Sequence, residues 1–429
     1  MSKTLSFVPK AIAYLLVSVV VGTLLLIAVY SLPMEQIHDH MGSSTECILS
    51  EGAYPDEYTW CMSELDNFTD AIMLSEAAYD SNESTLQKSL LSNRYILYND
   101  WSNLMTYTEG RMIERVDSYA RYWHGYLITL KPLLMLTDYS GIRTINLVLQ
   151  TLLSLLICFL MCRKGLRKFI LPYIISICII APLVIAKSLQ MSTCYYIFNL
   201  GCIAILLIKD KVDNSQFQYV FLILGIATAY MDFLTYPLAT FGMPAVFYLI
   251  CTNPDDGKAA LLKLINLLVC WGIGYVGMWV SKWILADVIT GTNVLANATN
   301  EAGIWVDEAK QNYTVWYTLY RNLRSFVLNP AFIVAFILAI VMVINIIRKN
   351  HVKQVFSSET LAKMLPYLVI AILPLIWYSV MMAHSYVHDF FTSKSLIMTA
   401  FSILCGLVEL NSSTDTNLIN YPSISERSR

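Results

Sequence analysis

The chain has 429 residues, of which 56% are hydrophobic and only 14% are charged. Soluble domains carry about 25% charged residues, so this composition excludes an ordinary soluble protein. The net charge of −2 gives no attraction for a polyanion, and we expect no nucleic-acid partner. The sequence indicates an integral membrane protein whose surroundings are a lipid bilayer.

The first apolar run covers residues 11–32 and follows Lys3 and Lys10. A cleaved signal peptide has an apolar core of about 7–15 residues and a small-residue cleavage site. This run is longer and ends at Pro33. We therefore interpret 1–32 as a cytoplasmic tip and a retained first transmembrane helix.

A long polar segment, 33–141, comes next and is rich in aromatic residues. Loops of this length are usually functional or disordered, and the aromatic content argues against disorder. We expect an extracytoplasmic loop that carries amphipathic interfacial helices. Cys47 and Cys61 lie in this loop, and they could either form a disulfide or remain two free thiols.

Residues 142–410 contain the remaining apolar runs, and a spanning helix needs roughly 20 apolar residues. With the first run they predict an all-α transmembrane bundle of about ten spans, followed by a polar, disordered cytoplasmic tail at 411–429. The predicted spans are 11–32, 142–162, 169–187, 190–208, 217–236, 238–252, 261–286, 331–347, 361–382 and 394–410.

Lys and Arg gather in every second connection of this ten-span arrangement, as they do on the cytoplasmic side of membrane proteins. Both termini are then cytoplasmic, and the long loop faces outward. Most candidate reactive side chains lie on the outward side. The basic residues are Lys3, Lys10, Arg163, Lys164, Arg167, Lys168, Lys209, Lys211, Lys258, Lys263, Arg348, Lys349, Lys353, Arg427 and Arg429.

Two carboxylates in the long loop, Asp66 and Asp70, are four residues apart and would share one face of a helix. One could act as a general base on an acceptor hydroxyl, or the pair could share a divalent cation such as Mg²⁺ or Mn²⁺. The alternative is a pair of solvated carboxylates in an acidic loop. Whether a metal is needed, and which cofactor if any, stays open.

The segment Arg121, Trp123 and His124 combines a cation, an aromatic ring and an imidazole before Gly125. Such a group could act in catalysis through His124 and hold a sugar ring or lipid headgroup through its neighbours. The alternative is an interfacial aromatic cluster with a hydrogen-bonded histidine.

Two histidines, His384 and His388, follow the ninth span at a spacing of four residues. They could bind a metal with Asp389, bind phosphate, or form a plain interfacial pair.

Three further ionisable residues, Arg143, Asp232 and Lys282, lie within or at the outer ends of spans, where such residues are functional candidates by default. The cations could hold a lipid phosphate, and Asp232 and Lys282 could instead pair with each other.

Several classes of enzyme are disfavoured. The chain has no P-loop, no Gly-rich dinucleotide motif, no Gly-x-Ser-x-Gly elbow and no His-Glu-x-x-His helix. The cytoplasmic connections are too short for a nucleotide-binding domain. The spans do not divide into two similar halves, which disfavours a secondary transporter.

From residue 11 to about 410 the arrangement resembles the GT-C superfamily of polytopic glycosyltransferases, including uncharacterised bacterial membrane proteins of that kind. The segments that carry the resemblance are Asp66-Asn67-Phe68-Thr69-Asp70, Tyr122-Trp123-His124-Gly125-Tyr126, Asp232-Phe233-Leu234-Thr235-Tyr236-Pro237, Gly274-Tyr275 with Trp279 to Trp283, and His384 to Thr392. One departure is that the first loop has no adjacent Asp-Asp or Asp-x-Asp.

The resemblance implies transfer of a sugar from a polyprenyl-phosphate donor to a glycan or lipid acceptor at the outer face of a bacterial plasma membrane. Asp66 or Asp70 would then be the base or metal ligand. Arg143, Lys282 and His388 would hold the lipid phosphate. A transporter or flippase of a lipid-linked glycan, or a polymerase, is the alternative function.

Overall fold

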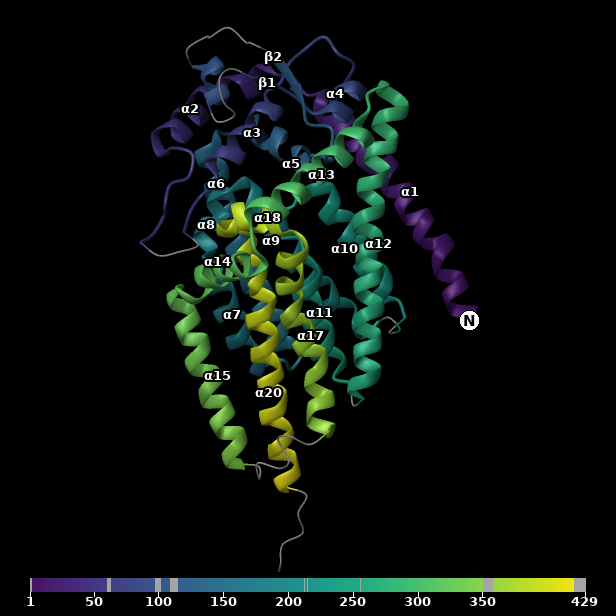
Figure 1. Cartoon of the computed structure of the whole chain (residues 1–429), viewed down its shortest axis with the longest axis vertical. Helices are drawn as coiled ribbons and strands as arrows, with labels where there is room; N and C mark the ends of the chain where they lie inside the picture. The colour runs from purple at the N-terminus through teal and green to yellow at the C-terminus, as the bar shows by residue number, and fades with distance from the viewer. Residues whose placement is uncertain are drawn as a thin grey trace, which may run out of the picture.

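The computed structural model describes residues 2–59, 63–96, 102–108, 115–211, 213, 215–254, 256–349 and 358–419. These residues are mostly helical. The named strands among them form one antiparallel pair, β1 (Asn93–Ile96) with β2 (Arg115–Ser118). Long helices run along the long axis of the molecule, and shorter elements cover one end (Figure 1). The all-α class predicted from the sequence is confirmed.

Seven helical stretches among the described residues are long and apolar enough to cross a membrane. They are α1 (Ser2–Tyr30), α6 (Tyr139–Arg163), α9 (Leu189–Ile208), α12 (Gly257–Thr290), α15 (Pro330–Lys349), α17 (Ser358–Val380) and the stretch Asp389–Asn411, which comprises α19 (Asp389–Thr392), η3 (Ser393–Leu396) and most of α20 (Ile397–Ile419). The chain is therefore a multi-pass helical membrane protein.

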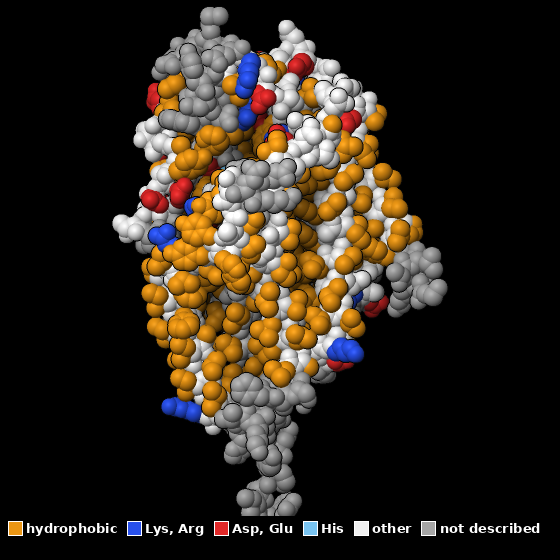
Figure 2. Space-filling view, in the orientation of Figure 1, with side chains coloured by type: hydrophobic (Ala, Val, Ile, Leu, Met, Phe, Trp, Pro, Cys, Tyr) orange, Lys and Arg blue, Asp and Glu red, His pale blue; other side chains and the backbone are white. Residues whose placement is uncertain are grey.

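The outward faces of these helices carry large exposed apolar side chains, such as Leu152, Leu155 and Phe159 on α6. Contiguous apolar surface of this extent is rare on soluble proteins and fits contact with lipid tails. In Figure 2 the apolar surface covers the bundle, and the charged side chains visible there lie mainly towards its two ends.

Three predicted spans take shorter or broken forms. Span 217–236 contains α10 (Phe217–Met231), and span 238–252 contains α11 (Ala239–Thr252). Span 169–187, predicted as one helix, is instead η2 (Arg167–Phe169), α7 (Ile170–Ile179) and α8 (Pro182–Lys187). The break falls at Ala181, which has φ +54°, directly before Pro182. Proline lacks the N–H that would continue the helix, so α8 begins at it.

The break leaves carbonyl groups that need donors, since an unsatisfied buried carbonyl is costly. Asn329 Nδ2 donates to the carbonyl of Ile179 at 2.6 Å, and Lys394 Nζ lies 3.4 Å from that of Ile180. Residues far along the chain therefore stabilise the broken helix.

The described parts of 33–141 form a layer that we call the cap, over one end of the bundle (Figure 1). It contains α2 (Glu35–Glu51), α3 (Asn67–Ala77), α4 (Thr85–Leu91), β1, η1 (Ser102–Tyr107), β2 and α5 (Leu127–Leu134). Buried Ile37, Met41 and Ile48 give α2 an apolar inner face. The cap is thus packed structure. Cys61, for which a disulfide to Cys47 and a free thiol were both considered, lies outside the described residues.

The long helix α12 is fastened to the cap by hydrogen bonds along its upper half. Trp123 Nε1 donates to the carbonyl of Met278 at 2.7 Å, and Trp283 Nε1 donates to that of Arg121 at 2.8 Å. These hydrogen bonds hold the cap residues 119–126 against the bundle. After α12 come α13 (Val294–Asn312) and α14 (Val315–Val327), and α18 (Met382–Val387) follows α17.

The C-terminal segment begins as helix. α20 continues to Ile419, so residues 411–419 of the predicted disordered tail are helical. Residues 420–429 lie outside the described part of the chain.

Candidate functional site

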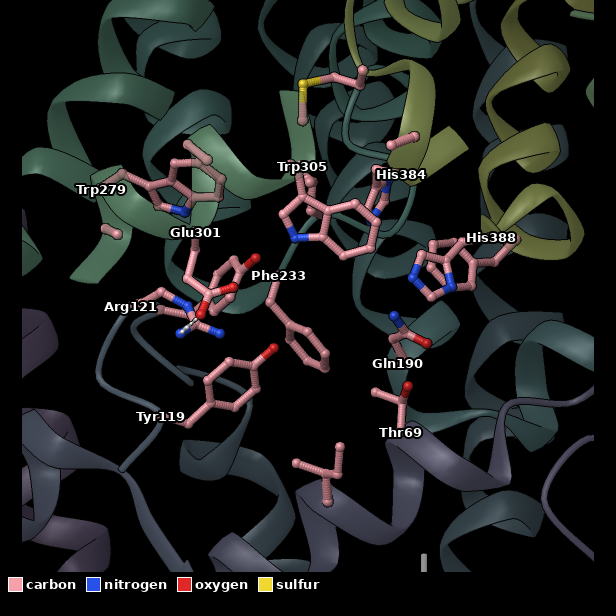
Figure 3. Close-up of a pocket in the computed structure, with 18 of the residues that line it drawn as sticks. Thr69, Tyr119, Arg121, Gln190, Phe233, Trp279, Glu301, Trp305, His384 and His388 are labelled. Atoms are coloured by element: carbon pink, nitrogen blue, oxygen red, sulfur yellow. Dashed lines mark ion pairs between the residues drawn. The ribbon is translucent and has the colours of Figure 1, made fainter. Parts of the chain in front are cut away.

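A cavity of about 840 Å³ lies between the cap and the ends of α12, α13 and α17–α18. Figure 3 shows Gln190 and Thr69 on one side of it, Tyr119 and Arg121 on another, and Trp305 beside His384. Cap, bundle and C-terminal helices all contribute. The cavity wall includes Asp66, Arg94, Asp117, Tyr119, Arg121, Tyr122, Gln190, Phe233, Trp279, Glu301, Trp305, His384 and His388.

Aromatic rings form much of the cavity wall and hold one another in place. The ring of Tyr122 meets Trp279 at 5.5 Å and Phe233 at 5.8 Å, both edge-on. Edge-to-face packing at these distances is favourable. The wall therefore offers several fixed apolar faces to a ligand ring.

Asp66 lies in the cavity wall as the N-cap of α3. Its Oδ1 accepts a hydrogen bond from the backbone N–H of Thr69 at 3.0 Å, as short polar caps do. The residue is buried, and burial raises the pKa of its carboxyl to about 7. Among the described residues no cation forms an ion pair with it. Asp66 thus has the protonation behaviour expected of a general base near neutral pH.

The two arginines of the wall both have acidic partners. Arg121 lies 3.5 Å from Glu301 and donates to Asn297 Oδ1 at 2.9 Å, and the ion pair is drawn in Figure 3. Arg94 lies 3.4 Å from Asp117. The cation predicted at Arg121 is therefore present in the cavity, as part of a balanced pair.

His384 and His388 both face the cavity, with ring centres 4.9 Å apart and Trp305 at 6.2 and 6.3 Å. Burial lowers the pKa of His388 to about 4 and that of His384 well below its ordinary value, so both rings are neutral at neutral pH. They can donate or accept a hydrogen bond, and they bring no positive charge for a phosphate.

The polar groups of two wall residues, Gln190 and Trp279, are not candidates from the sequence. The side-chain oxygen of Gln190 and the indole N–H of Trp279 are buried and have no hydrogen-bond partner within the described structure. Nδ1 of His384 is in the same condition. Buried polar atoms normally have partners, so three such atoms around one cavity suggest that a ligand supplies them. Sequence alone gives no signal for this, because it depends on missing partners.

Asp70, by contrast, does not line the cavity. Its carboxylate accepts from the backbone N–H groups of Leu189 and Gln190 at 2.8 and 3.1 Å and from the Tyr139 hydroxyl at 2.6 Å. Burial is the largest influence and raises the pKa of Asp70. The side chain serves the N-terminus of α9, where a carboxylate is stabilising.

Arg143 also lies away from the cavity, on the second turn of α6. Its guanidinium donates to Glu51 at 2.7 Å, to Asn67 Oδ1 at 2.8 Å and to the carbonyl of Lys187 at 2.7 Å. These hydrogen bonds join α2, α3 and α8. The structure therefore gives Arg143 a structural role.

His124 and Trp123 sit behind the cavity wall. His124 is buried, with Nε2 2.7 Å from the carbonyl of Tyr119 and Nδ1 2.9 Å from Glu76. The Tyr126 hydroxyl also donates to Glu76. Trp123 is buried against α12. The structure places both residues as supports of Tyr119 and Tyr122, which do face the cavity.

Asp232 and Lys282 do not pair with each other. Asp232 accepts from the backbone N–H groups of Leu234 and Thr235, both at 3.0 Å, and so shapes the turn that carries Phe233 to the cavity. Leu234 has φ +80° in this turn. Lys282 donates to the carbonyl of Leu90 at 2.8 Å. Each of the two buried side chains therefore has a structural role, because it satisfies the hydrogen bonds of backbone groups beside it.

The donor set for a divalent cation does not assemble around Asp66. No group of three or more His, Cys, Asp or Glu side chains gathers within the described chain. Asp70, which was expected to share the cation with Asp66, uses its oxygens to accept hydrogen bonds from α9 and Tyr139. The residues present do not fit the Mg²⁺ or Mn²⁺ site considered from the sequence.

Fold and site together define a multi-pass helical membrane protein with an aromatic, partly polar cavity beneath a packed cap. No protein-family model, curated protein or solved structure matches the chain.

Proposed function

We propose that the protein is a membrane glycosyltransferase that moves a sugar from a polyprenyl-phosphate donor to a glycan or lipid acceptor. The observation that carries this proposal is Asp66, a buried carboxyl without an ion-pair partner among the described residues, in the wall of a cavity built from aromatic rings. Flat aromatic faces suit the apolar faces of a sugar ring, and a carboxylate suits the removal of a hydroxyl proton.

In the proposed reaction the acceptor hydroxyl oxygen attacks C1 of the donor sugar, and the bond from C1 to the phosphate oxygen breaks. The hydroxyl proton passes to the carboxylate of Asp66, and polyprenyl phosphate leaves with the bonding electrons. A carboxyl with a pKa of about 7 is a stronger base than an ordinary aspartate and is still half ionised at neutral pH.

We assign the donor phosphate to Arg121. Its ion pair with Glu301 is long, at 3.5 Å, and both side chains keep contact with solvent. A guanidinium with spare donors can turn towards phosphate oxygens, which it binds in a planar fork. Arg143 and Lys282, considered from the sequence, are committed to partners elsewhere.

The proposed reaction requires the cavity to lie on the outer side of the membrane. We propose that α7–α8, α10 and α11 also cross, which raises the seven crossings to about ten. Both termini are then cytoplasmic, and the cap and cavity face outward across a bacterial plasma membrane. The alternation of Lys and Arg among the connections supports this orientation.

Transfer of radiolabelled sugar in proteoliposomes tests the proposal, with a panel of polyprenyl-phosphate sugars as donors. Wild type is expected to turn over one donor, and Asp66→Asn is expected to lose turnover, by at least roughly a hundredfold, as for loss of a general base. Asp39→Asn, at an exposed position in α2, is the matched control and keeps activity. Equal turnover in wild type and Asp66→Asn contradicts the assignment.

A transporter or flippase is the second candidate because of the break between α7 and α8. Interrupted membrane helices often form transport sites with their free carbonyls. Here the carbonyl of Ile179 already accepts from Asn329 and that of Ile180 lies near Lys394 Nζ, which favours the transferase. Movement of a fluorescent lipid-linked glycan across the bilayer, without turnover of any donor, would promote the flippase.

A further inference from the structure

We infer that the cavity selects an uncharged sugar ring, held by Gln190, Trp279 and His384, over a ring that bears a carboxylate. This inference rests on the proposed function and adds the class of sugar. Two sets of contacts carry it: the unpartnered polar atoms of the wall, and the pairing of its charges.

Gln190 is 3% exposed and occupies the first turn of α9. Its backbone N–H donates to Asp70 at 3.1 Å, so the backbone at this position is anchored. Its Oε1 atom is buried without a partner within the described structure, and Figure 3 shows the amide beside Thr69 at the cavity. This oxygen can accept from a hydroxyl, which donates, and it makes no hydrogen bond to a carboxylate, which only accepts.

Trp279 and His384 lie on two other sides of the cavity (Figure 3). The indole N–H of Trp279 can only donate, while Nδ1 of a neutral His384 donates or accepts according to its tautomer. Together with Gln190 they offer one acceptor, one donor and one group that serves as either. Hydroxyl groups around a ring match such a mixture, because each hydroxyl both donates and accepts.

The charges of the cavity wall also disfavour a carboxylate on the ring. The charged groups of the described wall are Asp66, Arg94 with Asp117, and Arg121 with Glu301. The arginines are matched by acids, and Asp66 adds negative charge when ionised. A ring carboxylate would have to break an ion pair or stay unpaired after losing water, and burying an unpaired charge is costly. The donor phosphate engages Arg121 and leaves no further cation for a second anion.

Saturation-transfer NMR tests this inference without a donor or any turnover. The full chain in nanodiscs that contain polyprenyl phosphate, which occupies Arg121 without donating a sugar, is mixed with methyl glycosides of glucose, galactose and mannose and with the matching methyl uronides, which differ only in a carboxylate at C6. At least one neutral glycoside is expected to receive saturation and to bind at least roughly fivefold more tightly than its uronide. Gln190→Leu and Trp279→Phe are each expected to weaken this binding roughly fivefold, about one hydrogen bond.

Gln150→Leu is the matched control, because Gln150 is buried on α6, also has an unpartnered Oε1, and does not line the cavity. Its binding should equal that of wild type. Equal binding of uronide and neutral glycoside, no saturation of any neutral glycoside, or unchanged binding in both folded cavity variants overturns the inference. Neutral-sugar binding that depends on Gln190, with no donor turned over, would instead sink the transferase and leave the selectivity standing.

Discussion

Nδ1 of His124 lies 2.9 Å from Oε2 of Glu76, and neither side chain is exposed to solvent. The other ring nitrogen donates to the carbonyl of Tyr119 at 2.7 Å, so the imidazole joins α3 to the strand end that leads into the cavity wall. His124 also has φ +54°, a backbone conformation that non-glycine residues adopt rarely and that surrounding contacts must hold. The contact between His124 and Glu76 therefore stabilises the position of the cavity wall.

Glu76→Ala is therefore expected to lower the free energy of unfolding by about 3–5 kcal/mol, because it leaves a buried partner unpaired. Thermal unfolding of the purified protein in detergent measures the loss. Glu35→Ala, on the exposed side of α2, is the control and should change little. Wild-type stability in Glu76→Ala would contradict the structural role.

Activity and stability should depend oppositely on pH through Asp66. Its folded pKa of about 7 lies above the unfolded value near 4, so the folded state holds the extra proton between these values. The stability due to this group is full below about pH 4 and is lost as pH rises through 7. Turnover, which needs the ionised base, should rise over the same approach to pH 7 and then level off.

Asp66→Asn should lose turnover and this pH-dependent part of the stability while keeping the fold, because asparagine is an equally good N-cap. Denaturant unfolding of both proteins from pH 5 to 8 gives the comparison. The gap in stability should grow with pH in favour of the variant. A constant gap would contradict the raised pKa of Asp66.

Asp70 should behave as a fold residue. Asp70→Ala leaves Tyr139 and two backbone N–H groups without their acceptor, so a loss of several kcal/mol is expected, at about 1–3 kcal/mol for each unsatisfied group. Thermal unfolding of Asp70→Ala beside Asp66→Ala tests the contrast. A folded, stable Asp70→Ala without turnover would return Asp70 to the catalytic role considered from the sequence.

Trp305 should act as a stacking face for the ligand. Its ring lies at the cavity beside His384 and His388 (Figure 3). Trp305→Ala is expected to lower kcat/KM roughly tenfold, in line with an aromatic contact of about 1.4 kcal/mol, and Trp305→Phe should keep most of it. Trp316→Ala, at an exposed aromatic on α14 outside the cavity, is the control for loss of a tryptophan. Donor titration in proteoliposomes gives both constants.

The sequence by itself determined the membrane character, the helical class and most of the long helices. Runs of about 20 apolar residues have few alternatives, because lipid leaves each backbone group to be satisfied within its own helix. The same local rule failed at 169–187, where Ala181 and Pro182 break the helix and distant Asn329 and Lys394 lie against the freed carbonyls.

Only the tertiary structure decided which polar residues are available to a ligand. Asp66 and Asp70 look equivalent in sequence, yet one lines the cavity and the other is consumed by the start of α9. Gln190 carried no signal, since its distinction is the lack of a partner for a buried oxygen. Availability of a side chain depends on which distant groups fold against it, and those contacts join residues that are far apart in the chain.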